Sequence, residues 1–223
     1  MKKAIAIVSG GLDSVTLAHL LAAQGYELQI LSFDYGQKHR KELEFARDCA
    51  QRLNAGFHII DLTTLTPLIG GNALTDNKVT IPHGHYAEQT MNITVVPNRN
   101  AIFLSLAFGA AVAQRAQLVG FGVHSGDHFI YPDCRPAFIE AFEAMQKKAI
   151  EGFGDPELKL YTPFLKTDKG GIVTQGHKIG VPFERTWSCY EGGALHCGEC
   201  GTCVERKESF AKAKVADPTS YAA

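Results

Sequence analysis

Strand-like and helix-like patterns alternate along the first part of the chain. Residues 4–8, 26–33 and 57–62 predict strands, and the segments 15–23 and 39–53 between them carry apolar residues at helical spacing. This alternation predicts an α/β fold with a mainly parallel, doubly wound sheet and right-handed crossovers. Ligands of such sheets bind beyond the carboxyl ends of the strands, so the turns after the first two strands are candidate sites.

The pattern is interrupted at residues 63–96, which are rich in Thr, Gly, Asn, His and Pro. Little periodicity is present there. A long irregular segment inside a compact domain fits a lid or binding loop, and it fits equally an insertion without a role.

The pattern then resumes. Residues 101–113 are apolar nearly all round and predict a buried helix, and 118–123 predicts a fourth buried strand. An amphipathic helix is expected over 136–150, opened by a proline in its first turn. One further helix is expected after Thr167 or Asp168, either of which would cap it.

The turn after the first strand reads Ser9-Gly10-Gly11-Leu12-Asp13-Ser14. A strand, a glycine-rich turn and a helix together point backbone N–H groups and the positive end of the helix at one spot, which suits a phosphate group. The two glycines allow an anion to approach the backbone closely, and the serines add hydroxyl donors. Asp13 would cap the helix or help hold a Mg²⁺ ion that bridges phosphates. The turn lacks the lysine of the common G-x-x-x-x-G-K-[ST] nucleotide loop.

Composition sets limits on the class of protein. The chain has 223 residues, of which 45% are apolar and 20% charged, with a formal net charge of −1. This favours one large α/β domain, alone or with a small appendage, and disfavours nucleic-acid binding by general electrostatics. We find no run of about 18 apolar residues and no signal-peptide pattern, and we expect a cytoplasmic protein without membrane contact.

Four of the six cysteines lie close together near the C-terminus, and Cys49 and Cys134 stand apart. Four thiolates complete a closed tetrahedral site of the kind that zinc favours, so we expect one structural zinc. An iron–sulfur cluster or unliganded cysteines are the alternatives, and His196 is a possible replacement ligand. The predicted ligands are Cys189, Cys197, Cys200 and Cys203.

The combination of motifs resembles the 7-cyano-7-deazaguanine synthase family of PP-loop ATP pyrophosphatases over essentially the whole chain. The motifs are the Ser-Gly-Gly-x-Asp-Ser loop, residues 33–37, Arg99-Asn100, residues 131–135, and the cysteine set after Thr186-Trp187-Ser188. Asn98 stands where the family pattern leads us to expect glycine. Asparagine tolerates the left-handed backbone conformation better than most residues.

The resemblance implies an enzyme that converts 7-carboxy-7-deazaguanine and ammonia into a nitrile at the expense of ATP. The carboxylate would be adenylated first and the resulting amide second, in the biosynthesis of queuosine and archaeosine precursors. It also implies ATP, Mg²⁺ and Zn²⁺ as cofactors and free ammonia as the nitrogen source. We expect an ATP-binding domain over residues 1–185, a zinc-binding segment over 186–223, and possibly a homodimer.

The resemblance further implies roles for individual residues. The expected ATP-binding set is Val8, Ser9, Gly10, Gly11, Leu12, Asp13, Ser14, Val15, Phe33 and Asp34. The expected catalytic set is Asp13, Ser14, Arg99 and Lys169. The weaker substrate-binding set is Asp127, Asp133 and Arg135. The simpler alternatives are a surface position for Arg99, a solvated Lys169, and an ion pair between Asp133 and Arg135.

Two other functions stay open at this point. One is another PP-loop enzyme, such as a tRNA thiolase or a lysidine synthase, although a near-neutral chain lacks the basic surface that tRNA requires. Thiolases often use catalytic cysteines, and Cys134 is harder to dismiss in that role than Cys49, which falls in a predicted helix. The other is a zinc-ribbon binding module on an inactive nucleotide fold.

Overall fold

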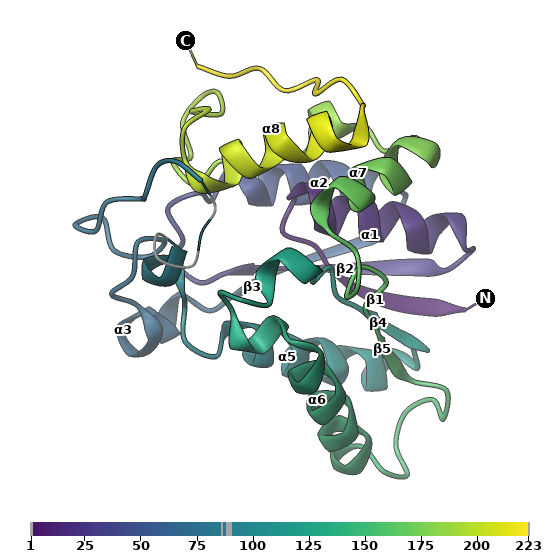
Figure 1. The fold of residues 1–223 in the computed structure, drawn as a ribbon. Coiled ribbons are helices and arrows are strands. Elements are labelled where there is room, and N and C mark those ends of the chain that lie inside the picture. Colours follow the sequence, from purple (N-terminus) through teal and green to yellow (C-terminus); the bar gives the residue numbers. More distant parts are fainter. Residues whose placement is uncertain (1, 86, 88–90, 223) are drawn as a thin grey trace.

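A single sheet of five parallel strands organises the molecule, in the order β3-β2-β1-β4-β5 (Figure 1). The computed structural model describes residues 2–85, 87 and 91–222. The order confirms the predicted doubly wound fold, because the chain moves outward from β1 to one edge and then returns to build the other. The strands are β1 (Lys3–Ile7), β2 (Glu27–Asp34), β3 (Gly56–Asp61), β4 (Leu118–Gly120) and β5 (Lys159–Tyr161).

Helices cover both faces of the sheet (Figure 1). One layer holds α1, α2 and α7, with α8 packed outside it against α7, and the opposite layer holds α5 and α6. Each layer encloses its own apolar core against the sheet. The helices are α1 (Leu12–Ala23), α2 (Glu42–Arg52), α3 (Thr66–Ile69), α5 (Arg99–Gln114), α6 (Pro136–Ala149), α7 (Lys169–Lys178) and α8 (Gly201–Ala213).

Three of these strands and helices were missed by the sequence patterns, one of them the four-residue helix α3 inside residues 63–96. Strand β5 has only three residues, too few to show periodicity, and α8 begins among the clustered cysteines, where spacing for metal ligands obscures helical spacing. Two local predictions are confirmed. Asn98 adopts the left-handed conformation with φ of 58°, and the Asp168 side chain caps α7 by accepting a hydrogen bond from the Gly171 N–H at 2.8 Å.

Part of the segment 63–96 is packed into the domain, although other described residues of it, such as Leu68, are exposed. Ala73, Leu74, Ile81 and Met91 are fully buried, and the Leu74 carbonyl accepts a hydrogen bond from the Lys38 N–H at 2.8 Å. This degree of packing argues against a loose insertion. Residues 86 and 88–90 of the segment lie outside the described residues.

The C-terminal segment is fastened to the rest of the domain at the glycine-rich turn. The Trp187 N–H donates a hydrogen bond to the Gly10 carbonyl at 2.9 Å, and Phe210 of α8 is buried in the core that α1 and α7 share. The boundary between residues 185 and 186 stays a prediction. These contacts are those expected of a segment packed on the sheet domain.

Gly10 permits a close approach between the glycine-rich turn and α2, because its φ is +95° and a Cβ there would lie 2.1 Å from the Glu42 carbonyl oxygen of α2. We expect Gly10→Ala to lower the free energy of unfolding by about 3 kcal/mol or more, through strain and a backbone clash. Gly25→Ala is the matched control, since Gly25 has φ of +81° but a Cβ there meets nothing within 4 Å. It should cost only about 1 kcal/mol. Urea unfolding measures both, and equal losses would contradict the assigned clash.

Candidate active site and metal centre

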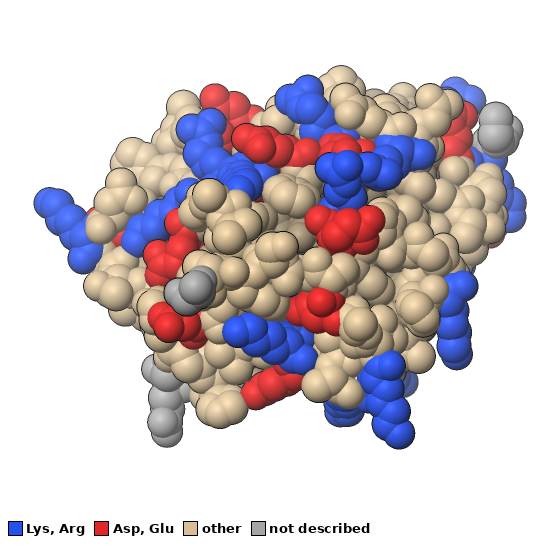
Figure 2. All heavy atoms as spheres, turned by 90° about the horizontal axis from the view of Figure 1, so that it is seen from above, with Lys and Arg blue, Asp and Glu red and all other residues tan. Residues whose placement is uncertain are grey.

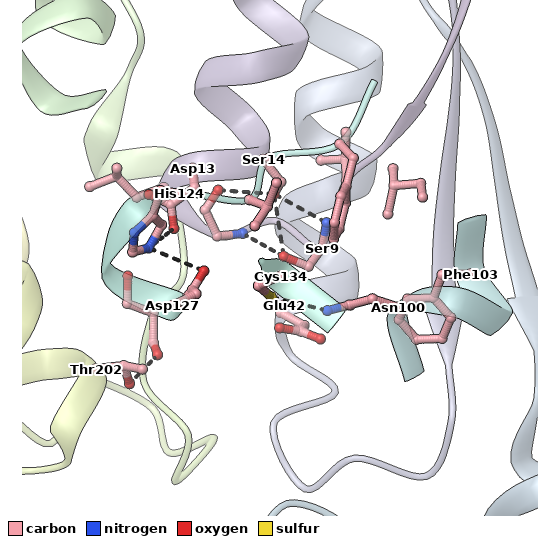
Figure 3. A pocket seen from close by; sticks show the side chains of 18 of the residues that line it. Ser9, Asp13, Ser14, Glu42, Asn100, Phe103, His124, Asp127, Cys134 and Thr202 are labelled. Carbon is pink, nitrogen blue, oxygen red and sulfur yellow. Dashed lines mark hydrogen bonds and ion pairs between the residues drawn. The ribbon is translucent and has the colours of Figure 1, made fainter. Parts of the chain in front are cut away.

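A cavity opens at the carboxyl ends of β1, β2 and β4, with the glycine-rich turn as one wall (Figure 3). The turn is held by its own serines. The Ser14 hydroxyl donates to the Gly11 carbonyl at 3.1 Å and lies within 3.2 Å of the Ser9 N–H, which donates to it. The Gly11 N–H donates to the Ser9 hydroxyl at 3.3 Å. The turn therefore presents hydroxyls and the N-terminus of α1 to one spot, as an anion site requires.

Two carboxylates and a buried imidazole lie beside this turn (Figure 3). The Nε2 atom of His124 is 3.4 Å from an Asp127 oxygen and 3.9 Å from an Asp13 oxygen. Since Nδ1 of His124 accepts a hydrogen bond from the Gly126 N–H, the neutral ring carries its proton on Nε2, facing the carboxylates. The Oδ1 atom of Asp13 is buried without a hydrogen-bond partner among the described residues. Such oxygens are the ligands that Mg²⁺ prefers.

Lys169 brings a positive charge into the cavity from the first turn of α7. Its side chain is only 15% exposed, and its Nζ lies 3.4 Å from an Asp13 oxygen and also pairs with Glu205. Burial disfavours the charge, but the two carboxylates outweigh it and raise the pKa of Lys169 above its ordinary value. Lys169 is therefore an ammonium ion at the turn, and the solvated alternative is wrong.

Aromatic rings and an arginine form the opposite wall. The rings of Phe33 and Phe103 are stacked, with centroids 4.0 Å apart. Arg99, the first residue of α5, donates to the Tyr35 hydroxyl at 3.2 Å and lies over the ring of that tyrosine. The surface alternative for Arg99 is wrong, because the side chain lines the cavity.

Most of the residues singled out from the sequence line this one cavity. They are Val8, Ser9, Gly11, Leu12, Asp13, Ser14, Phe33, Arg99, Asp127 and Lys169.

The remaining singled-out residues have other contacts. Gly10 packs under α2, Val15 lies in the core, and Asp34 pairs with Arg40. Asp133 accepts a hydrogen bond from the Asn100 N–H at 3.0 Å, and Arg135 donates to the His128 carbonyl at 2.8 Å. Asp133 and Arg135 thus each contact a backbone group, rather than forming the ion pair with each other that was the simpler alternative.

Several lining residues had no site role assigned from the sequence, among them His39, Glu42, Tyr190 and Thr202. His39 and Glu42 have the spacing H-x-x-E directly after the second strand, at the start of a helix. That placement at a strand end is a signal that could have identified them. Tyr190 and Thr202 reach the cavity only because the C-terminal segment folds back onto it.

The four clustered cysteines converge on one point. The Sγ atoms of Cys189, Cys197, Cys200 and Cys203 all lie within 4.8 Å of one another, as a tetrahedral metal site requires. Backbone N–H groups donate hydrogen bonds to the sulfurs, and the Cys197 N–H lies 3.3 Å from the Cys189 Sγ. Donors of this kind stabilise metal ligands. His196 is used elsewhere, since its Nε2 accepts a hydrogen bond from the Ser188 N–H at 3.0 Å.

A buried arginine joins this metal centre to the cavity wall. Arg206 is 1% exposed and donates hydrogen bonds to the Thr186 hydroxyl at 2.8 Å, the Ser188 hydroxyl at 3.1 Å and the Phe183 carbonyl at 2.9 Å. It also pairs with Asp217. Ser188 itself lines the cavity, so the segment that carries the cysteines forms part of the candidate site.

A parallel five-stranded sheet with a lysine-free glycine-rich turn after its first strand defines an α/β nucleotide-binding domain of the PP-loop type. Residues 3–214 match the family described as queuosine biosynthesis protein QueC, and the chain belongs to that family.

Curated relatives agree with this placement, and a solved structure shares the fold alone. The chain is 58% identical to the 7-cyano-7-deazaguanine synthase of Rhizobium johnstonii, over 98% of this chain and 92% of that protein. It is also 58% identical to the enzyme of the same name from Brucella ovis, over 98% of this chain and 93% of that protein. The structure of NMN synthetase from Francisella tularensis shares the fold, with a TM-score of 0.52 and 14% identity, over 86% of this chain and 68% of that one.

No helix among residues 2–85, 87 and 91–222 is both long enough and apolar enough to span a bilayer.

Proposed function

We infer that this chain is a 7-cyano-7-deazaguanine synthase that uses ATP to convert 7-carboxy-7-deazaguanine and ammonia into the nitrile. Family membership and the named relatives support this reaction. The observation that carries the mechanism is the glycine-rich turn, which lacks a lysine of its own and receives Lys169 from α7. A loop built for γ-phosphoryl transfer normally presents its own lysine to the β and γ phosphates. Here the arrangement suits holding those two phosphates as a leaving group.

The cavity offers a place for each part of ATP. The N–H groups of the turn, the Ser9 and Ser14 hydroxyls and Lys169 would bind the phosphates, and Phe33 would lie against the adenosine. Asp13 and Asp127 would hold a Mg²⁺ ion, which supplies charge neutralisation on the phosphates when bound. The buried, unpartnered Oδ1 of Asp13 fits that role.

Adenylation solves the chemical problem of a carboxylate, which is a poor electrophile. A carboxylate oxygen attacks the α-phosphorus and pyrophosphate leaves; ammonia then attacks the acyl carbon, and AMP leaves with that oxygen to give the amide. The amide oxygen attacks the α-phosphorus of a second ATP and pyrophosphate leaves again. AMP then leaves the carbon with that oxygen, and the nitrogen loses its two protons to give the nitrile. Arg99 would orient the oxygens and stabilise their charge, as guanidinium groups do.

The cysteine centre would hold one structural zinc. Four thiolates fill a tetrahedral shell and leave no position for water, so the ion would organise the C-terminal segment rather than react. An assembly of two chains stays a prediction.

Two observations disfavour the tRNA-thiolase alternative. Burial raises the pKa of the Cys134 thiol well above its ordinary value, and burial likewise raises the pKa of Cys49 to about 12, so neither is a ready thiolate nucleophile. On the face drawn in Figure 2, which includes α8, Lys and Arg side chains are interspersed with Asp and Glu. Mixed charge of this kind does not attract a polyanion strongly.

The nucleotide products test the proposed mechanism directly. We expect AMP and pyrophosphate, formed only when the carboxylate substrate is present, and an amide that accumulates transiently before the nitrile. Phosphorus NMR identifies the nucleotides and mass spectrometry the heterocycles. ADP and orthophosphate, with pyrophosphatase excluded, would show that adenylation is wrong.

Removal of the Ser14 hydroxyl tests the assignment of the turn. We expect Ser14→Ala to lower kcat/KM by about 100-fold or more, because the hydroxyl both holds the turn and faces the phosphates. Ser105→Ala is the matched control, since the exposed Ser105 hydroxyl also donates to a carbonyl, that of Ala101. Circular dichroism checks that both variants fold. Wild-type turnover by Ser14→Ala would remove the turn from the mechanism.

Metal content tests the cysteine centre. Elemental analysis should find one zinc per wild-type chain, and Cys200→Ala should lose most of it and unfold at a lower temperature, because three thiolates leave the shell incomplete. Cys49→Ala, which removes a buried thiol far along the chain in α2, should keep its zinc. Iron with labile sulfide in the wild-type protein would refute the zinc assignment.

A further inference from the structure

Glu42 is a carboxylate of the cavity to which the mechanism above gives no role. It begins α2, and its side chain is only 12% exposed. Its Oε1 atom accepts a hydrogen bond from the Gln37 amide at 3.1 Å, and its Oε2 atom lies 3.4 Å from Nε2 of His39. A carboxylate accepts about four hydrogen bonds, so these two contacts leave acceptor capacity inside the cavity.

His39, beside Glu42, has a ring nitrogen that is not paired within the described part of the chain. The residue is 4% exposed, and its Nδ1 atom is buried without a hydrogen-bond partner among the described residues. Burial, with a smaller contribution from Arg99, lowers the pKa of His39 to about 3, so the ring is neutral. A neutral imidazole has one donor and one acceptor nitrogen. Buried polar atoms are normally satisfied, so this unpaired nitrogen on the cavity wall is available to a ligand.

Flat side chains surround these groups. Tyr35, Phe103 and Tyr190 line the same cavity, and the His39 and Tyr190 rings lie with centroids 5.1 Å apart. The Arg99 guanidinium is close enough to affect Glu42 electrostatically. A carboxylate and a guanidinium between aromatic rings form a slot for a planar heterocycle that has N–H donors on one part of its edge and oxygen acceptors on the next.

We propose that Glu42, held by Gln37 and flanked by His39, recognises the N1–H and 2-amino group of the 7-deazaguanine substrate. This rests on the proposed function. The two adjacent donors of that edge match one carboxylate, and the neighbouring carbonyl oxygen and 7-carboxylate match Arg99. Adenine fits less well, because its N1 is an acceptor beside a single amino group and it has no oxygen for the guanidinium. Burial raises the pKa of Glu42 to about 8, and two donors from the substrate would favour its ionised form.

An analogue that lacks the 2-amino group tests this assignment. The wild-type enzyme should use 7-carboxy-7-deazaguanine at least about tenfold better, by kcat/KM, than 7-carboxy-7-deazahypoxanthine, because the analogue leaves a buried acceptor unpaired. Glu42→Gln keeps the size of the side chain and the acceptor for Gln37 but places an amide where the carboxylate was. It should raise the KM for the heterocycle about tenfold or more, remove most of the preference, and change the KM for ATP by less than about twofold.

Two further variants make the outcome unambiguous. Glu44→Gln, an exposed position in the same helical turn, should match the wild-type enzyme in every constant. Glu42→Asp keeps the charge with a shorter reach and should retain a preference for the 2-amino substrate despite a higher KM. If Glu42→Gln retains the wild-type preference, or raises the KM for ATP instead, the assignment is wrong. If the wild-type enzyme forms no nitrile, the proposed function fails, whatever the variants do.

Discussion

The contact between the turn at Gly10 and the first residues of α2 determines where the parts of the site lie. The left-handed backbone of Gly10 lets α2 approach to a distance that no Cβ would allow. That approach places Glu42 at the mouth of the glycine-rich turn. The Gly10 carbonyl meanwhile accepts the Trp187 N–H, so the C-terminal segment is anchored at the same residue. One small residue thus brings three remote segments of the chain to one cavity.

Two buried cations, Lys169 in the cavity and Arg206 beside it, each have an opposite charge next to them. Lys169 lies between Asp13 and Glu205, and Arg206 is enclosed by hydroxyls, a carbonyl and Asp217. An unpaired charge at such depth would cost several kcal/mol, and pairing removes most of that cost. Glu205 and Arg206 are neighbours on α8, so this one helix supplies a counter-ion to Lys169 and a support to the segment that carries the cysteines.

Local patterns were enough to predict the parallel sheet, the position of the glycine-rich turn at the end of its first strand, and the cysteine set. Apolar runs encode buried strands directly, and the residues of the turn and of the metal centre lie close together in the sequence. Residues whose position depends on packing between remote segments could not be placed from the sequence. The sequence places Asp133 and Arg135 near a strand end but does not say which way they face, and both take partners elsewhere. No sequence pattern identifies Glu205 as a partner of Lys169, because the two meet only through the packing of α8 against α7.

The stretch from Trp187 to Ser188 belongs to both the metal segment and the cavity, and this sharing has a thermodynamic consequence. If a metal on the cysteines orders that stretch, the protein loses less conformational entropy when a nucleotide binds. Linkage then requires the converse: an occupied cavity tightens the hold on the metal by the same factor. A metal on the cysteines would then act as a cooperative ligand of the domain, and its affinity measured without nucleotide would be a lower bound.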